Sequence, residues 1–329
     1  MRVGRLSQAL GDPRQRFVAG VALSALIVAL LLLTGSDYLA LLLATSGVYA
    51  VTVTGLNFLT GTSGQLSFGH NTFLAVGAYG TAIVLTRSTL SPWLATLAAV
   101  VLAGALATVV AYPITRLRGH YLSMATLALG LATYEIIANV SFTNGFVGMS
   151  LPRPLILFGL SSLAHPQAAI IVWLVVLLAV WSLFALRRSR FGKALEAARD
   201  NEDLAIACGL NVPLLRLGAF VISALYAAAG GALLAFVLGY ISPELFSVDT
   251  IATLFMMMYL GGTGGLFGVL VSTFVITALP QELSPLATWE VPIFGTLLLA
   301  YLVLRQPIQA LWRRLRASQP GATRRGETT

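Results

Sequence analysis

Charged residues and cysteines are scarce in this chain. Only 10% of its 329 residues are Asp, Glu, Lys or Arg, whereas soluble domains carry roughly 25%, so an ordinary soluble protein is excluded. The single cysteine, Cys208, excludes an intrachain disulfide and a cysteine metal cluster, and we expect it to be a small buried apolar residue. The sequence also lacks a G-x-x-x-x-G-K-S/T phosphate loop. Any ATP hydrolysis must therefore take place on another polypeptide.

Long apolar stretches dominate what is present. Hydrophobic residues make up 57% of the chain, and the mean hydropathy is +0.87. A helix that crosses a bilayer needs about 20 apolar residues, with its backbone groups bonded internally. The pattern predicts an all-α polytopic membrane protein with about 8–10 transmembrane helices. The count is given as a range because two of the spans are short and flanked by glycine. The predicted spans are 17–34, 39–59, 70–86, 92–112, 120–140, 168–186, 217–239, 248–260, 266–281 and 290–305.

Basic residues support one topology. With a cytoplasmic N-terminus, all of the 20 Lys and Arg residues except Arg87 and Arg153 fall in cytoplasmic segments, as in other membrane proteins. The net charge of +8 is spread over these loops, which indicates attraction to anionic lipid rather than nucleic-acid binding. The predicted organisation is a cytoplasmic segment 1–16, a transmembrane domain 17–305 with a cytoplasmic loop 187–216, and a cytoplasmic tail 306–329.

A glycine-rich phrase occurs twice, each time between two apolar stretches. Residues 61–69 read GTSGQLSFG and residues 261–268 read GGTGGLFG. Interrupted helices that recur in two halves of a chain are typical of transporters, and glycine permits close helix approach and left-handed turns. We therefore predict two related halves with glycine hinges; the alternative is two unrelated tight turns. The hinge candidates are Gly61, Gly64, Gly69, Gly261, Gly262, Gly264 and Gly265.

The loop 187–216 has the composition of an amphipathic helix. Gly209 suits a left-handed position just past a helix end, Pro213 would block its continuation, and Asp200-Asn201 could divide it into two short helices. A small apolar face surrounded by charges of both signs fits a groove on another protein. The alternative is a surface helix that packs only against its own chain.

Few polar side chains lie within the predicted spans. Glu135 is the only acid among them, and intramembrane acids are often functional; alternatively it lies near the outer end of its span, bonded to a neighbouring Tyr or Asn. His70 is expected to begin a helix rather than bind a metal. Interhelix hydrogen bonding is the common use of such groups. The candidates for a translocation path are Asn57, Gln65, Ser67, Asn71, Tyr79, Glu135 and Asn139.

Several segments together resemble one family. GTSGQLSFGHNTFLAVGAY at 61–79 resembles the signature of LIV-type permeases, the membrane subunits of branched-chain amino-acid ABC importers. RLRGHYLSMATLALG at 116–130 and SRFGKALEAARDNEDLAIACGLN at 189–211 follow in the expected order, and MMMYLGGTGGLFG at 256–268 completes the set. The chain is most similar to the LivM-like subunit. The match extends from about residue 40 to residue 305.

The resemblance implies an inner-membrane importer whose ATP is used by other subunits, with no cofactor bound by this chain. Its implied partners are a second, LivH-like permease, two cytoplasmic ATPases and a periplasmic binding protein. The loop would seat in an ATPase groove, although it departs from the EAA loop of other ABC importers because its glycine comes later. The implied coupling residues are Arg190, Phe191, Gly192, Glu196, Arg199, Asp200, Asn201, Glu202 and Gly209.

Other functions compete with an amino-acid importer. A permease of the same family could carry urea, short amides or other small organic solutes, because a binding protein would chiefly select the cargo. An ion-coupled secondary transporter would need no ATPase, but it usually needs more intramembrane charge than Glu135 alone. A membrane-embedded enzyme is disfavoured, since the sequence shows no convergent catalytic set.

Overall fold

A computed structural model describes residues 36–282, apart from 115–119, 158–159, 162–164 and 263. The chain divides into two compact units, Met1–Leu279 and Pro280–Thr329, and the contacts given below lie within the first. Several predicted segments fall outside the described residues. These are the N-terminal segment 1–16, the spans 17–34 and 290–305, and the tail 306–329.

Helices occupy all eight predicted spans that fall within the described residues. Their observed ends differ from the predicted ones by a few residues, because caps and flanking polar residues extend the helices beyond the apolar stretches. Two short helices, α8 and α9, fill the loop between α7 and α10. The helices are α3 (Asp37–Ser63), α4 (His70–Arg87), α5 (Pro92–Ile114), α6 (His120–Asn139), α7 (His165–Arg188), α8 (Arg190–Asp200), α9 (Glu202–Ala207), α10 (Val212–Leu238), α11 (Val248–Gly261) and α12 (Leu266–Glu282).

Five of the helices in the described part, α3, α5, α6, α7 and α10, are long and apolar enough to cross a membrane. The later helices α11 and α12 are apolar but shorter; the 14 residues of α11 reach only about 21 Å at 1.5 Å per residue. Helix α4 has 18 residues and carries polar groups in its first turn. The all-α, polytopic prediction is confirmed.

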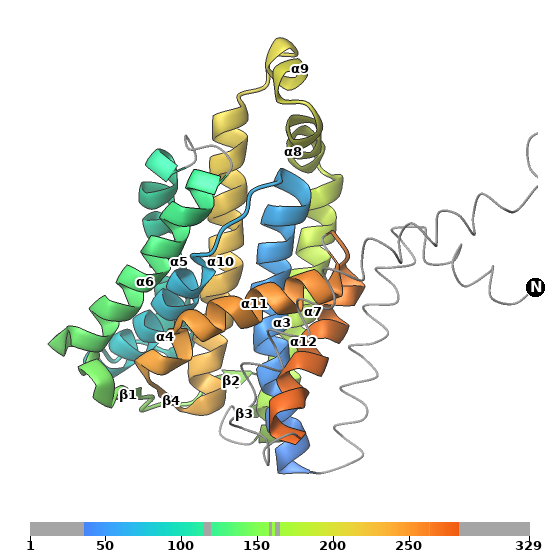
Figure 1. Ribbon diagram of the computed structural model, residues 1–329. Helices are drawn as coiled ribbons and strands as arrows, with labels where there is room; N and C mark the ends of the chain where they lie inside the picture. The colour runs from blue at the N-terminus through green and yellow to red at the C-terminus, as the bar shows by residue number, and fades with distance from the viewer. Residues whose placement is uncertain (1–35, 115–119, 158–159, 162–164, 263, 283–329) are drawn as a thin grey trace, which may run out of the picture. The chain divides into compact units, whose positions relative to one another are not determined.

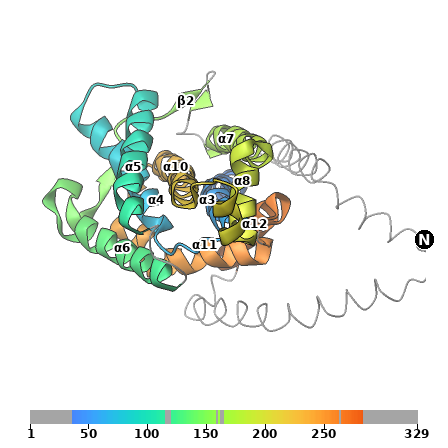
Figure 2. The same ribbon diagram turned by 90° about the horizontal axis from the view of Figure 1, so that it is seen from above.

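Helices α3 and α10 lie at the centre of the first unit (Figures 1 and 2). Helix α10 packs on α3, α4 and α5, and α3 also packs on α7. Small residues allow the backbones to approach closely: a Cβ on Gly77 of α4 would collide with the Ala228 carbonyl of α10, and one on Gly231 of α10 with the Leu74 carbonyl of α4. These contacts make α3, α4 and α10 a tightly packed core.

The two ends of the helices differ. At one end, α8 and α9 stand beyond the end of α3, between α7 and α10 (Figure 1). At the other end, short strands and 3-10 turns connect the helices, and two antiparallel pairs form, β1 with β4 and β2 with β3. These elements are η1 (Ser141–Thr143), η2 (Gly145–Val147), β1 (Met149–Ser150), β2 (Ile156–Leu157), β3 (Leu160–Ser161), β4 (Tyr240–Ile241) and η3 (Pro243–Phe246).

The loop between α7 and α10 holds two short helices and not one continuous helix, as the alternative of a break at Asp200-Asn201 had it. Asn201 ends α8 and caps α9, its Oδ1 accepting the Leu204 amide at 3.0 Å. Gly209 has the expected left-handed backbone, with φ of 81°. Pro213 lies in the first turn of α10, so it begins the next helix as well as separating it from α9. Cys208 is exposed, so the expectation of burial was wrong: α9 is six residues long and buries only Ala205.

Candidate functional site

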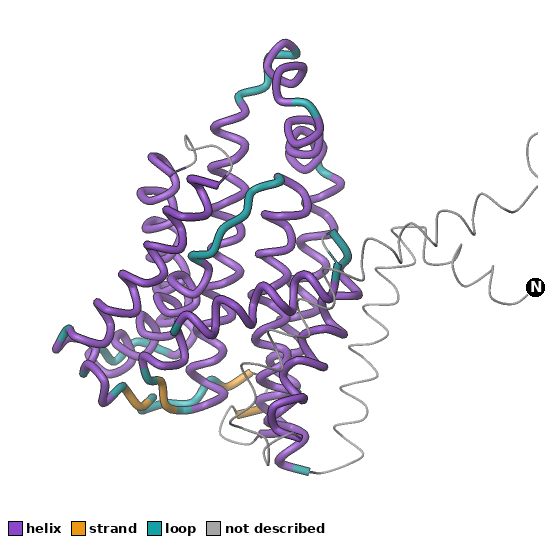
Figure 3. Tube along the Cα trace, viewed as in Figure 1, coloured by secondary structure: helices purple, strands orange, loops and turns teal. Residues whose placement is uncertain are grey.

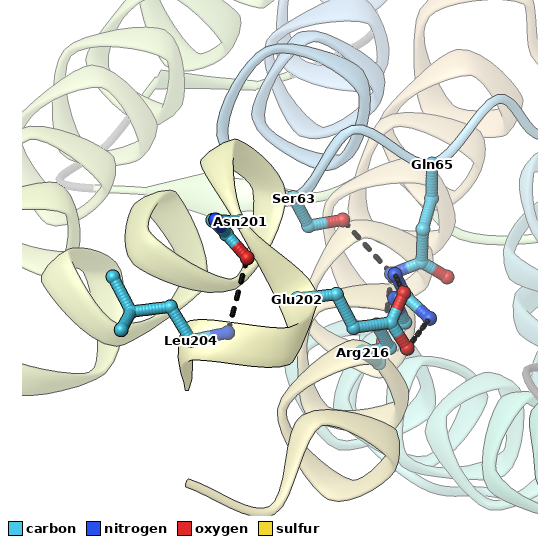
Figure 4. A network of polar contacts seen from close by, with 6 residues as sticks. All are labelled: Ser63, Gln65, Asn201, Glu202, Leu204 and Arg216. Atoms are coloured by element: carbon cyan, nitrogen blue, oxygen red, sulfur yellow. Dashed lines mark hydrogen bonds and ion pairs between the residues drawn. The ribbon is translucent and has the colours of Figure 1, made fainter. Parts of the chain in front are cut away.

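Helices α8 and α9 are fastened to their own chain by polar contacts. The Arg216 guanidinium of α10 forms an ion pair with Glu202 at 2.9 Å, and the Arg216 carbonyl accepts from Gln65 Nε2 at 3.1 Å. Gln65 Nε2 also donates to Ser63 Oγ at 2.8 Å. Figure 4 shows these groups together, with Asn201 capping α9 beside them. The network joins α9 and α10 to the end of α3 and the first glycine phrase.

The predicted coupling residues divide into two groups by exposure. Phe191 packs against Gly218, and Gly192 is buried against the carbonyls of Leu186 and Arg187, so with Glu202 they hold the loop in place. The others have exposed positions from which they could meet another protein. These exposed residues are Arg190, Glu196, Arg199, Asp200, Asn201 and Gly209.

Three large apolar side chains on this loop were not among the predicted coupling residues. Leu204 and Ile206 of α9 are 62% and 52% exposed, and Leu214 at the start of α10 is 63% exposed. A helix of six residues is too short to show the helical repeat that would separate its buried from its exposed face. Together they give the tip of the loop an apolar surface.

The C-terminal end of α8 contacts the first glycine phrase. Arg199 of α8 donates from its guanidinium to the Gly61 carbonyl and also pairs with Asp200 at 2.8 Å. Gly64 caps α3 in a left-handed conformation, with φ of 74°, and a Cβ there would lie 2.9 Å from Arg199 Cγ. Residues 64–69 then run as an extended segment to the start of α4 (Figure 3). The predicted hinge at Gly64 is therefore in direct contact with α8.

The second glycine phrase is bound by Asn57 of α3 and Arg187 of α7. Asn57 Oδ1 accepts the Gly264 amide at 2.7 Å, and Asn57 Nδ2 donates to the Gly262 carbonyl at 3.1 Å. Arg187 donates to the Gly264 carbonyl at 2.6 Å and reaches Asn57 Oδ1 at 3.4 Å. Both amide atoms of Asn57, a predicted path residue, thus contact the turn. Arg187 was not among the predicted site residues, although its place beside the charged loop was a signal.

The two glycine phrases touch each other. A Cβ on Gly61 would lie 2.7 Å from the Gly264 nitrogen and 3.0 Å from its Cα, so this approach requires glycine. Of the predicted hinges, Gly64, Gly262 and Gly264 have left-handed φ values of 74°, 83° and 88°. Gly61, Gly69, Gly261 and Gly265 lack a left-handed φ. Segments about 200 residues apart in sequence therefore meet beside α8.

Four predicted path residues are almost fully buried and share one property. Each has a side-chain polar atom without a hydrogen-bond partner among the described residues, and such atoms are rare unless they meet water or a ligand. Asn71 also donates to the Phe246 carbonyl at 3.0 Å, and the Tyr79 and Phe246 rings are 5.8 Å apart. The four atoms are Gln65 Oε1, Ser67 Oγ, Asn71 Oδ1 and Tyr79 Oη.

Glu135 and His70 match their more ordinary interpretations. Glu135 is exposed near the end of α6, and Asn139 Nδ2 donates to its carbonyl at 2.9 Å and to Oε2 at 3.2 Å. His70 is the first residue of α4, and its Nε2 lies 2.6 Å from Ser223 Oγ of α10. No group of three His, Cys, Asp or Glu side chains within the described ranges could hold a metal ion.

Several known proteins with similar sequences are transport permeases. The chain is 28% identical to the high-affinity branched-chain amino acid transport system permease protein LivM of Escherichia coli over 282 residues, covering 78% of this chain and 66% of that protein. It is 25% identical to LivH of the same organism over 278 residues, covering 78% and 89%. It is also 29% identical to the autoinducer 2 import system permease protein LsrC of Yersinia enterocolitica, covering 53% and 54%. The chain thus spans just under two thirds of the length of LivM.

No solved structure matches the chain. The family model described as the permease component of branched-chain amino acid transport systems matches residues 38–305, which include all the helices described above except the first residue of α3. This multi-pass membrane protein therefore belongs to the family of branched-chain amino acid transport system permease components.

Proposed function

We propose that this chain is a permease subunit of an ATP-driven importer for branched-chain or related amino acids. The observation that carries the proposal is the pair α8 and α9, which offers exposed charged and apolar side chains at one end of the helices and contacts the first glycine phrase through Arg199. The names of the relatives LivM and LivH support the cargo. The protein would lie in the inner membrane.

The proposed assembly contains a second, LivH-like permease, two cytoplasmic ATPases and a periplasmic binding protein. Both termini would be cytoplasmic. Basic residues of the described part agree with this orientation: Arg190, Lys193 and Arg199 lie on α8, whereas the Arg153 guanidinium binds the carbonyls of Leu85 and Leu90 at the far end of α4. The positive charge of α8 would then face the cytoplasm.

In this mechanism, closure of the ATPases displaces α8 and α9. Arg199 passes the movement to Gly61 at the end of α3, and the adjoining extended segment 64–69 changes its position. Gln65 and Ser67 lie on that segment, and Asn71 and Tyr79 lie on the helix that follows it. Their unpaired buried polar atoms would contact the passing solute or its water. ATP is bound by the partner subunits and not by this chain.

A related function differs only in the cargo. The similarity to LsrC, an autoinducer 2 import system permease protein, supports a same-family permease for another small organic solute such as urea or a short amide. An ion-coupled secondary transporter has less support, because Glu135 lies on an exposed part of α6 and is bonded to its neighbour Asn139. Uptake assays with several labelled solutes would distinguish the cargoes.

The test is co-purification in mild detergent, followed by mass spectrometry of the bound proteins. Cells would express the tagged chain with its neighbouring transport subunits. We expect two ATPases and a second permease to be recovered with the unchanged chain. If no ATPase is recovered even after crosslinking, the proposed function is refuted.

A variant tests the loop itself. Leu204→Ser combined with Ile206→Ser removes exposed apolar surface without removing a buried contact, so we expect ATPase recovery and uptake to fall at least tenfold. The matched control is Val147→Ser, a change to a side chain that is 75% exposed in η2. The control should keep both activities. Equal ATPase recovery with all three proteins would contradict docking at this loop.

A further inference from the structure

The junction between α7 and α8 leaves little room for independent movement. Ser189 separates the two helices; its amide donates to the Ala185 carbonyl at 3.1 Å, and its Oγ accepts the Gly192 amide at 3.3 Å. A Cβ on Gly192 would lie 2.5 Å and 2.6 Å from the carbonyls of Leu186 and Arg187. Because α8 packs so closely on the end of α7, a displacement of α8 must also move the backbone of Arg187.

The Arg187 side chain is bound by main-chain and amide oxygens. Its two terminal nitrogens donate to the Gly264 carbonyl and to Asn57 Oδ1. No carboxylate of the described residues forms an ion pair with it. Hydrogen bonds from a charged donor are stronger than neutral ones, so Arg187 binds the turn firmly without a fixed ionic partner. Such a contact can follow the turn to a new position if the carbonyl remains within reach.

Open space adjoins two residues of the turn. Positions where a Cβ would extend from Gly262 and Gly264 have no atom within 4 Å, and both residues adopt left-handed conformations. The turn joins the short apolar helices α11 and α12, and Phe255 of α11 stacks on Phe68 of the extended segment, with 4.2 Å between ring centroids. A movement of the turn would therefore reach the segment that carries Gln65 and Ser67.

We propose that Arg187 is a positioning residue that transmits the displacement of α8 to the 262–265 turn, through its hydrogen bond to the Gly264 carbonyl and the shared oxygen of Asn57. The inference rests on the proposed function, in which ATPases displace α8. Arg187 would transmit the movement to the second glycine phrase, as Arg199 transmits it to the first. The loop then acts on both phrases at once.

The experiment uses the complete importer reconstituted in proteoliposomes, with ATP hydrolysis and labelled leucine uptake measured together. Arg187→Gln removes the charge, and Arg187→Lys keeps it but loses the two-pronged donor geometry. The matched control is Arg188→Gln, because the neighbouring Arg188 is exposed and its guanidinium lies over the Phe184 ring at 4.4 Å. A second readout is amide hydrogen exchange of the 262–265 turn in the same preparations.

For Arg187→Gln, we expect at least a tenfold loss of uptake per ATP hydrolysed and faster exchange of the turn amides. Arg187→Lys should recover part of the uptake, and Arg188→Gln should match the unchanged importer. Equal loss of uptake and hydrolysis, or unchanged amide exchange, overturns the role of Arg187. The unchanged importer reports separately on the proposed function, since that function fails if this importer neither assembles nor takes up solute.

Discussion

The contact between the two glycine phrases can be tested by adding one methyl group. In Gly61→Ala, the new Cβ would lie 2.7 Å from the Gly264 nitrogen and 3.2 Å from Asn57 Oδ1. Favourable non-bonded contacts need about 3.5 Å, so the 262–265 turn would have to retreat by about 0.8 Å. The hydrogen bonds of Gly264 to Asn57 and Arg187, now 2.7 and 2.6 Å, would stretch to about 3.5 Å, beyond the usual range.

The loss of stability in Gly61→Ala can be estimated from those two hydrogen bonds. A neutral hydrogen bond contributes about 1 kcal/mol and one to a charged group about 1.5–3 kcal/mol. Weakening both hydrogen bonds therefore costs about 2.5 kcal/mol. Replacing glycine with alanine in a helix returns up to about 1 kcal/mol, so the net destabilisation is about 1.5 kcal/mol. For a chain of 329 residues, an unfolding entropy of about 2.1 cal/mol/K per residue converts this destabilisation into a fall of about 2 °C in the melting temperature. We therefore expect Gly61→Ala to melt about 2 °C lower.

The assay is the temperature at which half of the purified protein in detergent remains monodisperse. The matched variant is Gly265→Ala, where the added Cβ would lie 3.5 Å from the carbonyls of Gly261 and Gly262, an ordinary distance, and φ is not left-handed. It should melt within about 1 °C of the unchanged protein, because it removes no packing or hydrogen bond. Equal melting temperatures for the two variants would refute the reasoning.

Gly77→Ala should lower the stability by about 2 kcal/mol through overpacking against the α10 backbone. Gly80→Ala, whose Cβ would lie 3.1 Å from Ala99 Cβ, needs a shift of only a few tenths of an ångström and should cost less; thermal stability in detergent compares the two variants. Cys208, exposed on the loop between α7 and α10, should react with an impermeant maleimide in inside-out vesicles and not in right-side-out ones, and the reverse result would invert the proposed topology. Glu135→Gln should leave uptake and its pH dependence unchanged, because the side chain is exposed; a loss of proton-dependent uptake would favour ion coupling.

The sequence predicted the helices well because hydropathy is a local property. Apolar stretches of about 20 residues can satisfy their backbone groups only as helices in lipid, and the eight spans within the described part are indeed helical. Gly209 was equally predictable, because glycine adopts a left-handed turn at a helix end. The capping of α9 by Asn201 was not predicted, although Asn is a common residue at a helix start and Asp200-Asn201 indicated a possible break. Such signals require only the immediate neighbours in the sequence.

Contacts between distant segments could not be predicted in the same way. Arg187 and Gly264 are 77 positions apart, and Asn57 and Gly264 are 207 apart. An Asn within an apolar span predicts only that its amide needs partners, which fits a pathway and a helix contact equally well. Cys208 shows the same limit, since its burial depended on how a short helix would pack. The relation between the two halves stays a prediction.

The binding of the second glycine phrase by Asn57 and Arg187 has an evolutionary consequence. In the described residues of this turn, Asn57 and Arg187 bind main-chain atoms: the carbonyls of Gly262, Gly264 and Gly265 and the Gly264 amide. These contacts therefore depend on the left-handed backbone conformation that Gly262 and Gly264 adopt. Selection would therefore act on the glycines and on the two binding side chains as a set, and relatives that replace Arg187 should carry compensating changes at Asn57 or in the turn.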